Sequence, residues 1–274
     1  MRQMTILDVQ RVSLEILKDV HEFCVENNIR YSLAYGTLLG AIRHNGFIPW
    51  DDDIDIMMPR PDYERFIRSY KSRKGYKLFA RGAEGGNHVY RCIARVCEME
   101  KTYVDPTDSP WVNEKTGIFI DILPIDGAPD TQKEALRHIK QRKLWLKLSY
   151  TYRKKHVPFR LIFKMRPEMM VKTLVKKGLS LFVSNRCIDR MIAHQRRYDC
   201  DECEYICANT TYGIGEWMPK RMVERYELHR FEDSEFYIFS EYDYVLKNYY
   251  NNYMDIPPVE ERTVHIANRY YWTD

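Results

Sequence analysis

The sequence predicts an α+β fold in which a mixed β-sheet is flanked by helices. Three observations lead to this prediction. Strand-like and helical segments alternate through the first 130 residues, residues 132–198 are almost wholly helical in pattern, and the last third is irregular and rich in tyrosine. We therefore expect a core at residues 1–130, a basic helical region at residues 131–200, and a C-terminal segment at residues 201–274 that packs back on the core.

The first region alternates between helices and strands. Thr5 and Asp8 have the spacing of a helix-capping box, and apolar residues then recur at helical spacing until Asn27, which predicts a first helix. The elements expected after it are a strand at 31–35, a turn at Gly36 and Thr37, a helix at 38–44, a strand at 53–58, a helix from Pro61, and strands at 76–80, 88–97 and 118–123.

The remaining elements are mostly helical. Residues 132–198 are expected to form helices interrupted near Pro158 and Pro167, because proline removes a backbone donor and clashes with the preceding turn. The elements expected after these are a strand at 236–239, a helix at 241–250, and an extended turn at Pro257 and Pro258 before Arg262 and His265.

Length and composition indicate a globular protein. The chain has 274 residues, of which 45% are hydrophobic, and it contains no repeats. The N-terminus lacks the apolar stretch of a signal peptide, and no window approaches about 20 consecutive apolar residues. Seven cysteines at irregular spacing suit a reducing compartment. We expect a cytoplasmic protein whose contact with a membrane is peripheral.

Basic charge is concentrated between Arg137 and Lys177, a segment with fourteen Lys/Arg and one acid, Glu168. Because the whole chain carries a net charge of only +4, the remainder is net acidic. The segment also contains Trp145 and Phe163, a composition typical of helices that dock on an anionic membrane surface. The alternative is that its apolar residues pack on the core and its charges are solvated. No recognition motif accompanies the charge, so we expect no nucleic-acid partner.

Acidic residues on two predicted strands are the candidates for catalysis. Asp53 and Asp55 lie two residues apart, so on a strand they project from the same face. Asp121 lies in an apolar strand, where an acid needs an unusual partner or a metal. Carboxylates this close repel, and oxygen ligands favour Mg²⁺ or Mn²⁺. The alternative is that residues 51–53 form a solvated acidic turn; if the strand begins early, Asp51 could assist the pair.

Longer stretches around these acids resemble a known family. A Gly-Thr turn after one strand, Asp-apolar-Asp on a second and another Asp on a third is the arrangement of the nucleotidyltransferase superfamily. Three runs closely resemble the signature of the LicD family of phosphotransferases: residues 35–44 (YGTLLGAIRH), 46–56 (GFIPWDDDIDI) and 60–64 (RPDYE). Residues 119–127 (FIDILPIDG) resemble its second block, and residues 253–265 resemble its C-terminal block.

The resemblance implies a nucleotidyltransferase-like core that transfers a phospho-alcohol group, most often phosphocholine, from a CDP-linked donor such as CDP-choline. The acceptor would be a sugar hydroxyl of a lipid-linked, cell-surface glycan precursor of the teichoic acid or lipopolysaccharide type, and CMP would be released. Asp53 and Asp55 would hold Mg²⁺, and Asp121 would be either a third ligand or the base at the acceptor hydroxyl. Such an enzyme would work at the inner face of the cell membrane.

Five further residues are candidates for substrate binding. Gly36 and Thr37 would bind phosphate through backbone N–H groups, since glycine allows close approach. The alternative is an ordinary turn between a strand and a helix. Arg43, His44 and Arg60 could neutralise the phosphates of the donor, but each could equally be a surface or capping charge.

Two other functions stay open. One is nucleotidyl transfer to a small phosphorylated substrate, and the other is a catalytically silent glycan-binding protein docked on a membrane.

The tyrosines of the last third suggest an aromatic cage for a quaternary ammonium group, although such residues usually pack. Cys200, Cys203 and Cys207, with His194 upstream, offer ligands for zinc, but their spacing is incomplete and we expect buried free thiols. Trp50 is expected to pack and not to stack on a nucleobase.

Overall fold

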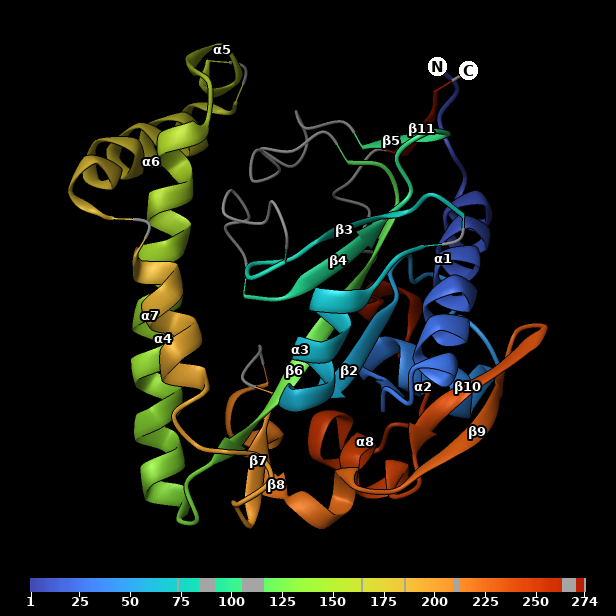
Figure 1. Cartoon of the computed structure of the whole chain (residues 1–274). Helices are drawn as coiled ribbons and strands as arrows, with labels where there is room; N and C mark the ends of the chain where they lie inside the picture. The colour runs from blue at the N-terminus through green and yellow to red at the C-terminus, as the bar shows by residue number, and fades with distance from the viewer. Residues whose placement is uncertain are drawn as a thin grey trace.

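A mixed sheet of seven strands forms the centre of the protein (Figure 1). The computed structural model describes residues 1–72, 74–83, 92–104, 116–163, 165–184, 186–208, 212–262 and 270–273. The strand order is β1-β2-β6-β4-β3, and β7 and β8 extend the sheet from the second half of β6. The strands are β1 (Ser32–Leu33), β2 (Asp55–Pro59), β3 (Lys77–Phe79), β4 (Ala94–Cys97), β6 (Phe119–Ala128), β7 (Tyr205–Cys207) and β8 (Met218–Pro219). The predicted mixed sheet flanked by helices is confirmed.

Strand β6 changes partners along its length. Its first half is parallel to β2 and antiparallel to β4, so that Asp121 lies opposite both Asp55 and Arg95. Its second half pairs with β7, from Asp126 to Ala128. The predicted strand at 118–123 is therefore too short, because β7 supplies a new hydrogen-bonding partner beyond the end of β4. For the predicted strand at 88–97, β4 is confirmed, whereas residues 88–91 lie outside the described residues.

Strand β2 begins at Asp55, so the prediction of a strand over 53–58 is wrong at its start. The N–H of Asp121 donates to the carbonyl of Ile54 at 2.9 Å. Before Ile54 the chain leaves β6, and Asp51 lies close to Gly36, at the start of the helix that begins at Tyr35. Asp53 consequently lies in irregular backbone. The argument from strand alternation holds for Asp55 but not for Asp53.

Two helices of the first region cover one face of the sheet. Helix α1 (Ile6–Glu26) begins at the predicted capping box, in which Thr5 accepts a hydrogen bond from the Asp8 N–H and Asp8 accepts one from the Thr5 N–H. Helix α3 (Arg60–Ser69) packs beside α1 through aromatic side chains, and both helices contact β6. Their shared aromatic contacts fix these two helices on the same side of β6.

Helix α2 (Tyr35–His44) begins earlier than predicted, so Gly36 and Thr37 form its first turn and not a turn before it. The Thr37 hydroxyl accepts a hydrogen bond from the Asp55 N–H at 2.9 Å. This contact ties the start of α2 to the start of β2. The predicted strand at 31–35 shrinks to β1 because the helix takes over at Tyr35.

The basic region is helical, as predicted, and lies to one side of the sheet (Figure 1). Its elements are α4 (Gln132–Arg153), η2 (Lys154–His156), α5 (Phe159–Ile162), α6 (Pro167–Leu179), η3 (Ser180–Phe182) and α7 (Arg186–Gln195). Helices α4 and α7 lie side by side and bury a small cluster around Tyr152, Cys187 and Ile188. The expected interruptions near Pro158 and Pro167 are confirmed. Within the described ranges, no helix is both long and apolar enough to cross a membrane.

The C-terminal segment contributes a hairpin and a helix to the main core. Its elements are η4 (Gly213–Glu216), η5 (Lys220–Val223), β9 (Tyr226–Phe231), β10 (Ser234–Phe239), α8 (Tyr242–Tyr250), η6 (Val259–Glu261) and β11 (Tyr270–Trp272). The predicted strand at 236–239 and helix at 241–250 correspond to β10 and α8. Strand β9 was not predicted, because half of its side chains are exposed and only Phe231 is buried, which leaves no apolar alternation to detect.

This segment also joins the two ends of the chain. Strand β11 pairs with β5 (Thr102–Val104), and the N–H of Trp272 donates to the carbonyl of Arg2, so the termini lie side by side (Figure 1). Strand β10 contacts β1, where the Phe239 N–H donates to the Ser32 hydroxyl at 3.0 Å. His265 lies outside the described residues.

The hairpin β9–β10 should contribute to the free energy of unfolding through its buried side chains. Phe236 is fully buried, so Phe236→Ala is expected to lower the free energy of unfolding by about 3–5 kcal/mol through lost burial and a cavity. Leu228→Ala, on the same hairpin but half exposed, should change it by less than about 0.5 kcal/mol. Urea denaturation of both variants measures this, and equal effects would show that the hairpin does not support the core.

Candidate active site

A cavity of about 620 Å³ lies beside the first turn of α2 and combines acidic, basic and aromatic side chains. We call it the aspartate cavity. Its acids are Asp51, Asp53, Asp55, Asp255 and Glu261, its arginines are Arg43 and Arg262, and its aromatic residues are Tyr35, Trp50, Tyr212, Tyr250 and Tyr253. Residues from the first region and from the C-terminal segment therefore meet at one site.

Backbone contacts hold the acidic loop against α2. A Cβ atom on Gly36 would lie 2.6 Å from Oδ2 of Asp51, so glycine is what lets this carboxylate approach the helix. The Gln10 side-chain amide donates to the carbonyl of Asp51 at 2.8 Å. Thr37 fixes the N–H of Asp55 from the same helical turn. The sequence-predicted residues Gly36 and Thr37 thus position the acids.

The acids of this cavity are crowded enough to alter their ionisation. Burial, followed by repulsion from Asp53, raises the pKa of Asp51 to about 8. Burial and the charges of Asp53 and Asp121 raise the pKa of Asp55 well above its ordinary value. Crowding of this kind disfavours the charged carboxylates unless a cation compensates them.

Asp121 lies next to Asp55 on the sheet but is held by an arginine. Arg95 donates to both oxygens of Asp121, at 2.5 and 2.9 Å, and its guanidinium also lies over the Phe119 ring. Asp121 does not line the aspartate cavity, whereas Asp51 does. The structure therefore brings Asp51 together with Asp53 and Asp55, and it places Asp121 behind them in an ion pair.

The donor set suits a hard divalent cation. Carboxylate oxygens are the ligands that Mg²⁺ and Mn²⁺ prefer, and Asp51, Asp53 and Asp55 supply carboxylates from one short loop and strand start. Among the described residues, however, no three of these acids bring one oxygen each within 4.8 Å of the others.

The cavity also contains groups that attract anions. Gly36 lies in the first turn of α2, and the N-terminus of a helix carries unsatisfied N–H groups and a partial positive charge. Arg43 donates from Nη1 to the carbonyls of Tyr253 and Asp255, at 2.9 and 3.0 Å. Its Nε is buried and has no hydrogen-bond partner among the described residues. Arg43 therefore anchors the C-terminal segment to α2.

Aromatic rings form one wall of the cavity. The rings of Tyr35 and Tyr212 stack at 5.1 Å, and the Tyr212 hydroxyl donates to the Tyr250 hydroxyl at 2.8 Å. Behind them the buried Glu216 accepts hydrogen bonds from the Tyr35 hydroxyl and the Tyr212 N–H, both at 3.2 Å. Sequence reasoning did not single out Tyr212 and Glu216, because neither belongs to a motif and their partners are distant in the chain.

Trp50 and His44 lie at the edge of this wall. The guanidinium of Arg262 lies over the Trp50 ring, 4.2 Å from its centroid. The His44 ring meets Trp50 edge-on, and burial together with the charge of Arg43 lowers the pKa of His44. His44 does not line the aspartate cavity. Trp50 thus presents one ring face to a cation.

Arg60 lies elsewhere. It forms two hydrogen bonds of 2.6 Å with Asp126 and lines a different cavity, beside α3 and α7. Of the five predicted substrate-binding residues, the structure brings Gly36, Thr37 and Arg43 to the acids and leaves His44 and Arg60 outside the cavity.

The cysteines of the C-terminal segment are free thiols. Cys200 and Cys207 are buried, and Cys203 is partly buried. Among the described residues, Cys200 brings its sulfur within 4.8 Å of a carboxylate oxygen of Asp199 and of Asp201, whereas Cys203 and Cys207 do not join this group. His194 is occupied by a hydrogen bond with the carbonyl of His138 at 2.9 Å.

An acidic cavity at a helix N-terminus on a mixed sheet is consistent with a nucleotidyltransferase-type domain. The family model described as "LicD/FKTN/FKRP, nucleotidyltransferase domain" matches residues 28–168, slightly more than half of the chain. The chain therefore belongs to the LicD family, and the predicted resemblance is confirmed. The matched residues include Asp51, Asp53 and Asp55, but not Asp255 or the tyrosines at positions 212 and 250.

Curated relatives agree with this assignment. The chain is 29% identical, over 99% of both sequences, to the lipopolysaccharide cholinephosphotransferase LicD of Haemophilus influenzae. Shorter stretches match uncharacterised proteins of two Rickettsia species: 42% identity with one from Rickettsia typhi over 23% of this chain and 21% of that protein, and 52% with one from Rickettsia prowazekii over 18% of each. The first similarity extends through the basic helices and the C-terminal segment.

The raised pKa of Asp51 has a consequence for stability. An acid whose pKa is higher in the folded than in the unfolded state binds more protons when folded, between its ordinary value of 3.8 and about 8. The free energy of unfolding should therefore fall as pH rises through this range in EDTA, and Asp51→Asn should make the fall shallower. Thermal unfolding of both proteins across the range measures the difference. Parallel profiles would contradict the assigned crowding.

Proposed function

We propose that the protein is a metal-dependent phosphotransferase that moves phosphocholine from CDP-choline to a sugar hydroxyl of a cell-surface glycan precursor and releases CMP. The observation that carries the proposal is the cavity in which Asp51, Asp53 and Asp55 face the first turn of α2. The similarity to a lipopolysaccharide cholinephosphotransferase along the whole chain supports the choice of phosphocholine and of a glycan acceptor.

The acids and the first turn of α2 would bind different parts of the donor. Asp53 and Asp55, assisted by Asp51, would hold Mg²⁺, which when bound neutralises charge on the diphosphate and on the leaving CMP. The N–H groups of the first turn of α2 and the buried Nε of Arg43 would orient phosphate oxygens. These groups are fixed before the substrate arrives, which is what electrostatic stabilisation of a transition state requires.

Asp121 would act through its ion pair. Because Arg95 binds both of its oxygens, Asp121 is a poor candidate for a base unless that pair opens. Its negative charge next to Asp55 raises the pKa of Asp55, and Arg95 offsets part of that effect. We therefore assign the metal to Asp53, Asp55 and Asp51. Asp121 would either become a further ligand after releasing Arg95, or act on the metal site only through its charge next to Asp55.

The aromatic wall suits the choline group. A quaternary ammonium cannot donate hydrogen bonds and is recognised by the faces of aromatic rings. Trp50 already has a guanidinium over its ring, and Tyr212 and Tyr250 face the same cavity. The acceptor and the CDP group would then occupy the remaining space beside the acids.

The basic helices provide a surface for an anionic membrane. Around α5, α6 and η3, large apolar side chains are exposed: Phe159 57%, Phe163 67%, Val175 58%, Leu181 72% and Phe182 88%. Exposed basic residues lie among them, including Arg160, Lys172 and Lys176. Mixed apolar and basic side chains at the tip of a helical projection fit the interface of an anionic bilayer (Figure 1). A lipid-linked acceptor would be delivered at that surface.

The reaction is tested by incubating the protein with CDP-choline, Mg²⁺ and lipopolysaccharide, which supplies the acceptor hydroxyl, and measuring CMP. We expect CMP release that EDTA abolishes, and a loss of at least about 10³-fold in Asp53→Asn and in Asp55→Asn, since each removes charge from the metal site. Circular dichroism should show that both variants are folded. Asp233→Asn, an exposed acid outside the cavity, should keep the wild-type rate. Activity retained in either cavity variant would refute the metal assignment.

The products separate this reaction from its rivals. Nucleotidyl transfer from CTP would release pyrophosphate, and CDP-choline would then yield no CMP. A catalytically silent glycan-binding protein would release neither product, yet would still bind the membrane. Comparing CDP-choline with CDP-ethanolamine, CDP-ribitol and CDP-glycerol identifies the alcohol.

Membrane docking is tested by sedimentation with vesicles. Phe159→Ser and Phe182→Ser should each weaken binding to vesicles that contain phosphatidylglycerol by about tenfold, the loss expected for part of a buried phenyl group. Leu7→Ser, which removes an exposed apolar side chain from α1, is the matched control and should have no effect. Equal binding to pure phosphatidylcholine, or insensitivity to salt, would contradict the electrostatic part of the contact.

A further inference from the structure

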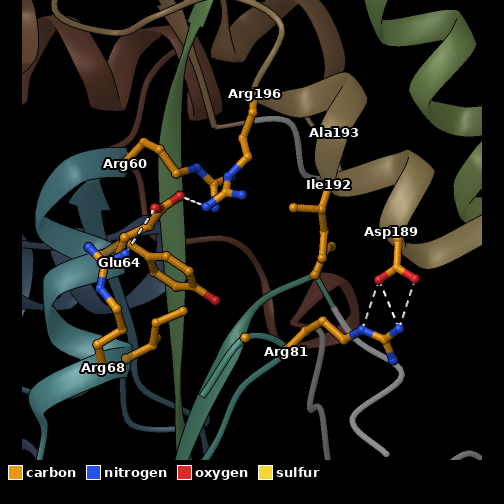
Figure 2. Close-up of a pocket in the computed structure, with 12 residues that line it drawn as sticks. Arg60, Glu64, Arg68, Arg81, Asp189, Ile192, Ala193 and Arg196 are labelled. Carbon is orange, nitrogen blue, oxygen red and sulfur yellow. Dashed lines mark hydrogen bonds and ion pairs between the residues drawn. The ribbon is translucent and has the colours of Figure 1, made fainter. Parts of the chain in front are cut away.

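A second cavity, of about 460 Å³, lies between α3 and α7 and has no role in the reaction proposed above. Figure 2 shows the side chains of Arg60 and Arg196 meeting at one side of it, and Arg81 turned toward Asp189 at the other. The charged residues that line it are Arg60, Glu64, Arg68, Arg81, Asp189 and Arg196. We call it the arginine cleft.

The arginine cleft and the aspartate cavity lie on opposite faces of the sheet. Asp126, which holds Arg60, is five residues from Asp121 on the continuous strand β6. An odd spacing along a strand sends two side chains to opposite faces, so α3 covers the face away from Asp121. The two cavities share no lining residue. A ligand in the arginine cleft is therefore separate from one bound at the acids.

Arg60 and Arg196 present like charges to the same space. Arg60 is only 12% exposed, and its two hydrogen bonds to the fully buried Asp126 leave three of its five N–H donors. Arg196 pairs with Glu64 from the end of α7, and Figure 2 shows its guanidinium beside that of Arg60. Burial, followed by the charge of Arg60, lowers the pKa of Arg196. An anion between the two guanidinium groups would relieve this repulsion.

The acids of the cleft add a second kind of contact. Asp189 is held by two hydrogen bonds from Arg81, at 3.0 and 2.9 Å, and remains 53% exposed. Glu64 lies between Arg68 and Arg196. Each carboxylate has further lone pairs that can accept from hydroxyl groups. Guanidinium donors for phosphate therefore lie next to carboxylate acceptors for hydroxyls.

We propose that the arginine cleft binds a phosphorylated carbohydrate, with its phosphate between Arg60 and Arg196 and its sugar hydroxyls toward Glu64 and Asp189. The anion site stands on the geometry of the cleft alone. The choice of a carbohydrate rests on the proposed function, in which the acceptor is a glycan. The cleft would hold a phosphorylated part of the acceptor, away from the sugar that reacts.

Binding to the full-length protein tests this by isothermal titration in EDTA without nucleotide. We expect glucose 1-phosphate to bind with an affinity that falls with salt, inorganic phosphate to bind more weakly, and glucose to give no signal. Arg196→Gln should weaken glucose 1-phosphate binding by about tenfold, because it removes a charged donor to the phosphate, and Arg68→Gln should weaken it less, because Arg68 acts through its ion pair with Glu64. Arg60→Gln is avoided because it would leave Asp126 buried and unpaired.

Two matched controls make the result specific. Arg186→Gln removes the same charge from an exposed position at the other end of α7 and should leave binding unchanged. Asp53→Asn should also leave it unchanged. Wild-type affinity in both cleft variants, or an equal loss in Arg186→Gln, would overturn the site; a loss confined to Asp53→Asn would locate binding at the acids. Equal affinity for inorganic phosphate and glucose 1-phosphate would overturn the carbohydrate. Because CMP release is not measured, these outcomes stand whether or not the proposed reaction is found.

Discussion

Repulsion among Asp51, Asp53 and Asp55 is the interaction around which this site is built. Three carboxylates share a partly buried cavity, and burial makes each charge more costly than it would be in water. Much of the surrounding structure holds them in place. Gly36 makes room for Asp51, Thr37 fixes the backbone of Asp55, and the pairing of β2 with β6 brings Asp55 beside Asp121. An arrangement that costs stability in this way is typical of functional sites.

Arg95 and the first turn of α2 compensate part of the negative charge of these acids. Arg95 neutralises Asp121 through two hydrogen bonds, while the first turn of α2 directs its partial positive charge toward the cavity. Arg43 and Arg262 also line the cavity: Arg43 binds the carbonyls of Tyr253 and Asp255, and Arg262 lies over the Trp50 ring. The cavity is thus prepared for a cation among the acids and for an anion against the helix and Arg43.

Local patterns predicted much of the fold and about half of the site. The capping box at Thr5, the prolines that interrupt the basic helices and the short acidic motif at Asp53 and Asp55 act through near neighbours, so the sequence displays them. The first turn of α2 was misread because its hydrogen bond goes to Asp55, eighteen positions later. Strand β9 buries only Phe231 and shows no apolar alternation, and the partner of Arg60 lies sixty-six positions away. Contacts at such separations depend on the sheet and cannot be read from periodicity.

The residues of the aromatic wall are synthesised later than the acids that the wall encloses. The aspartates and α2 leave the ribosome early, whereas Tyr212, Glu216 and Tyr250 follow only after the basic helices, and Arg43 must wait for the carbonyls of Tyr253 and Asp255. N-terminal segments generally fold first during translation. A nascent chain would therefore carry the acids without the wall that encloses them. The cavity closes only when the last part of the chain arrives, so an incomplete polypeptide has no finished site in which to bind or turn over a substrate.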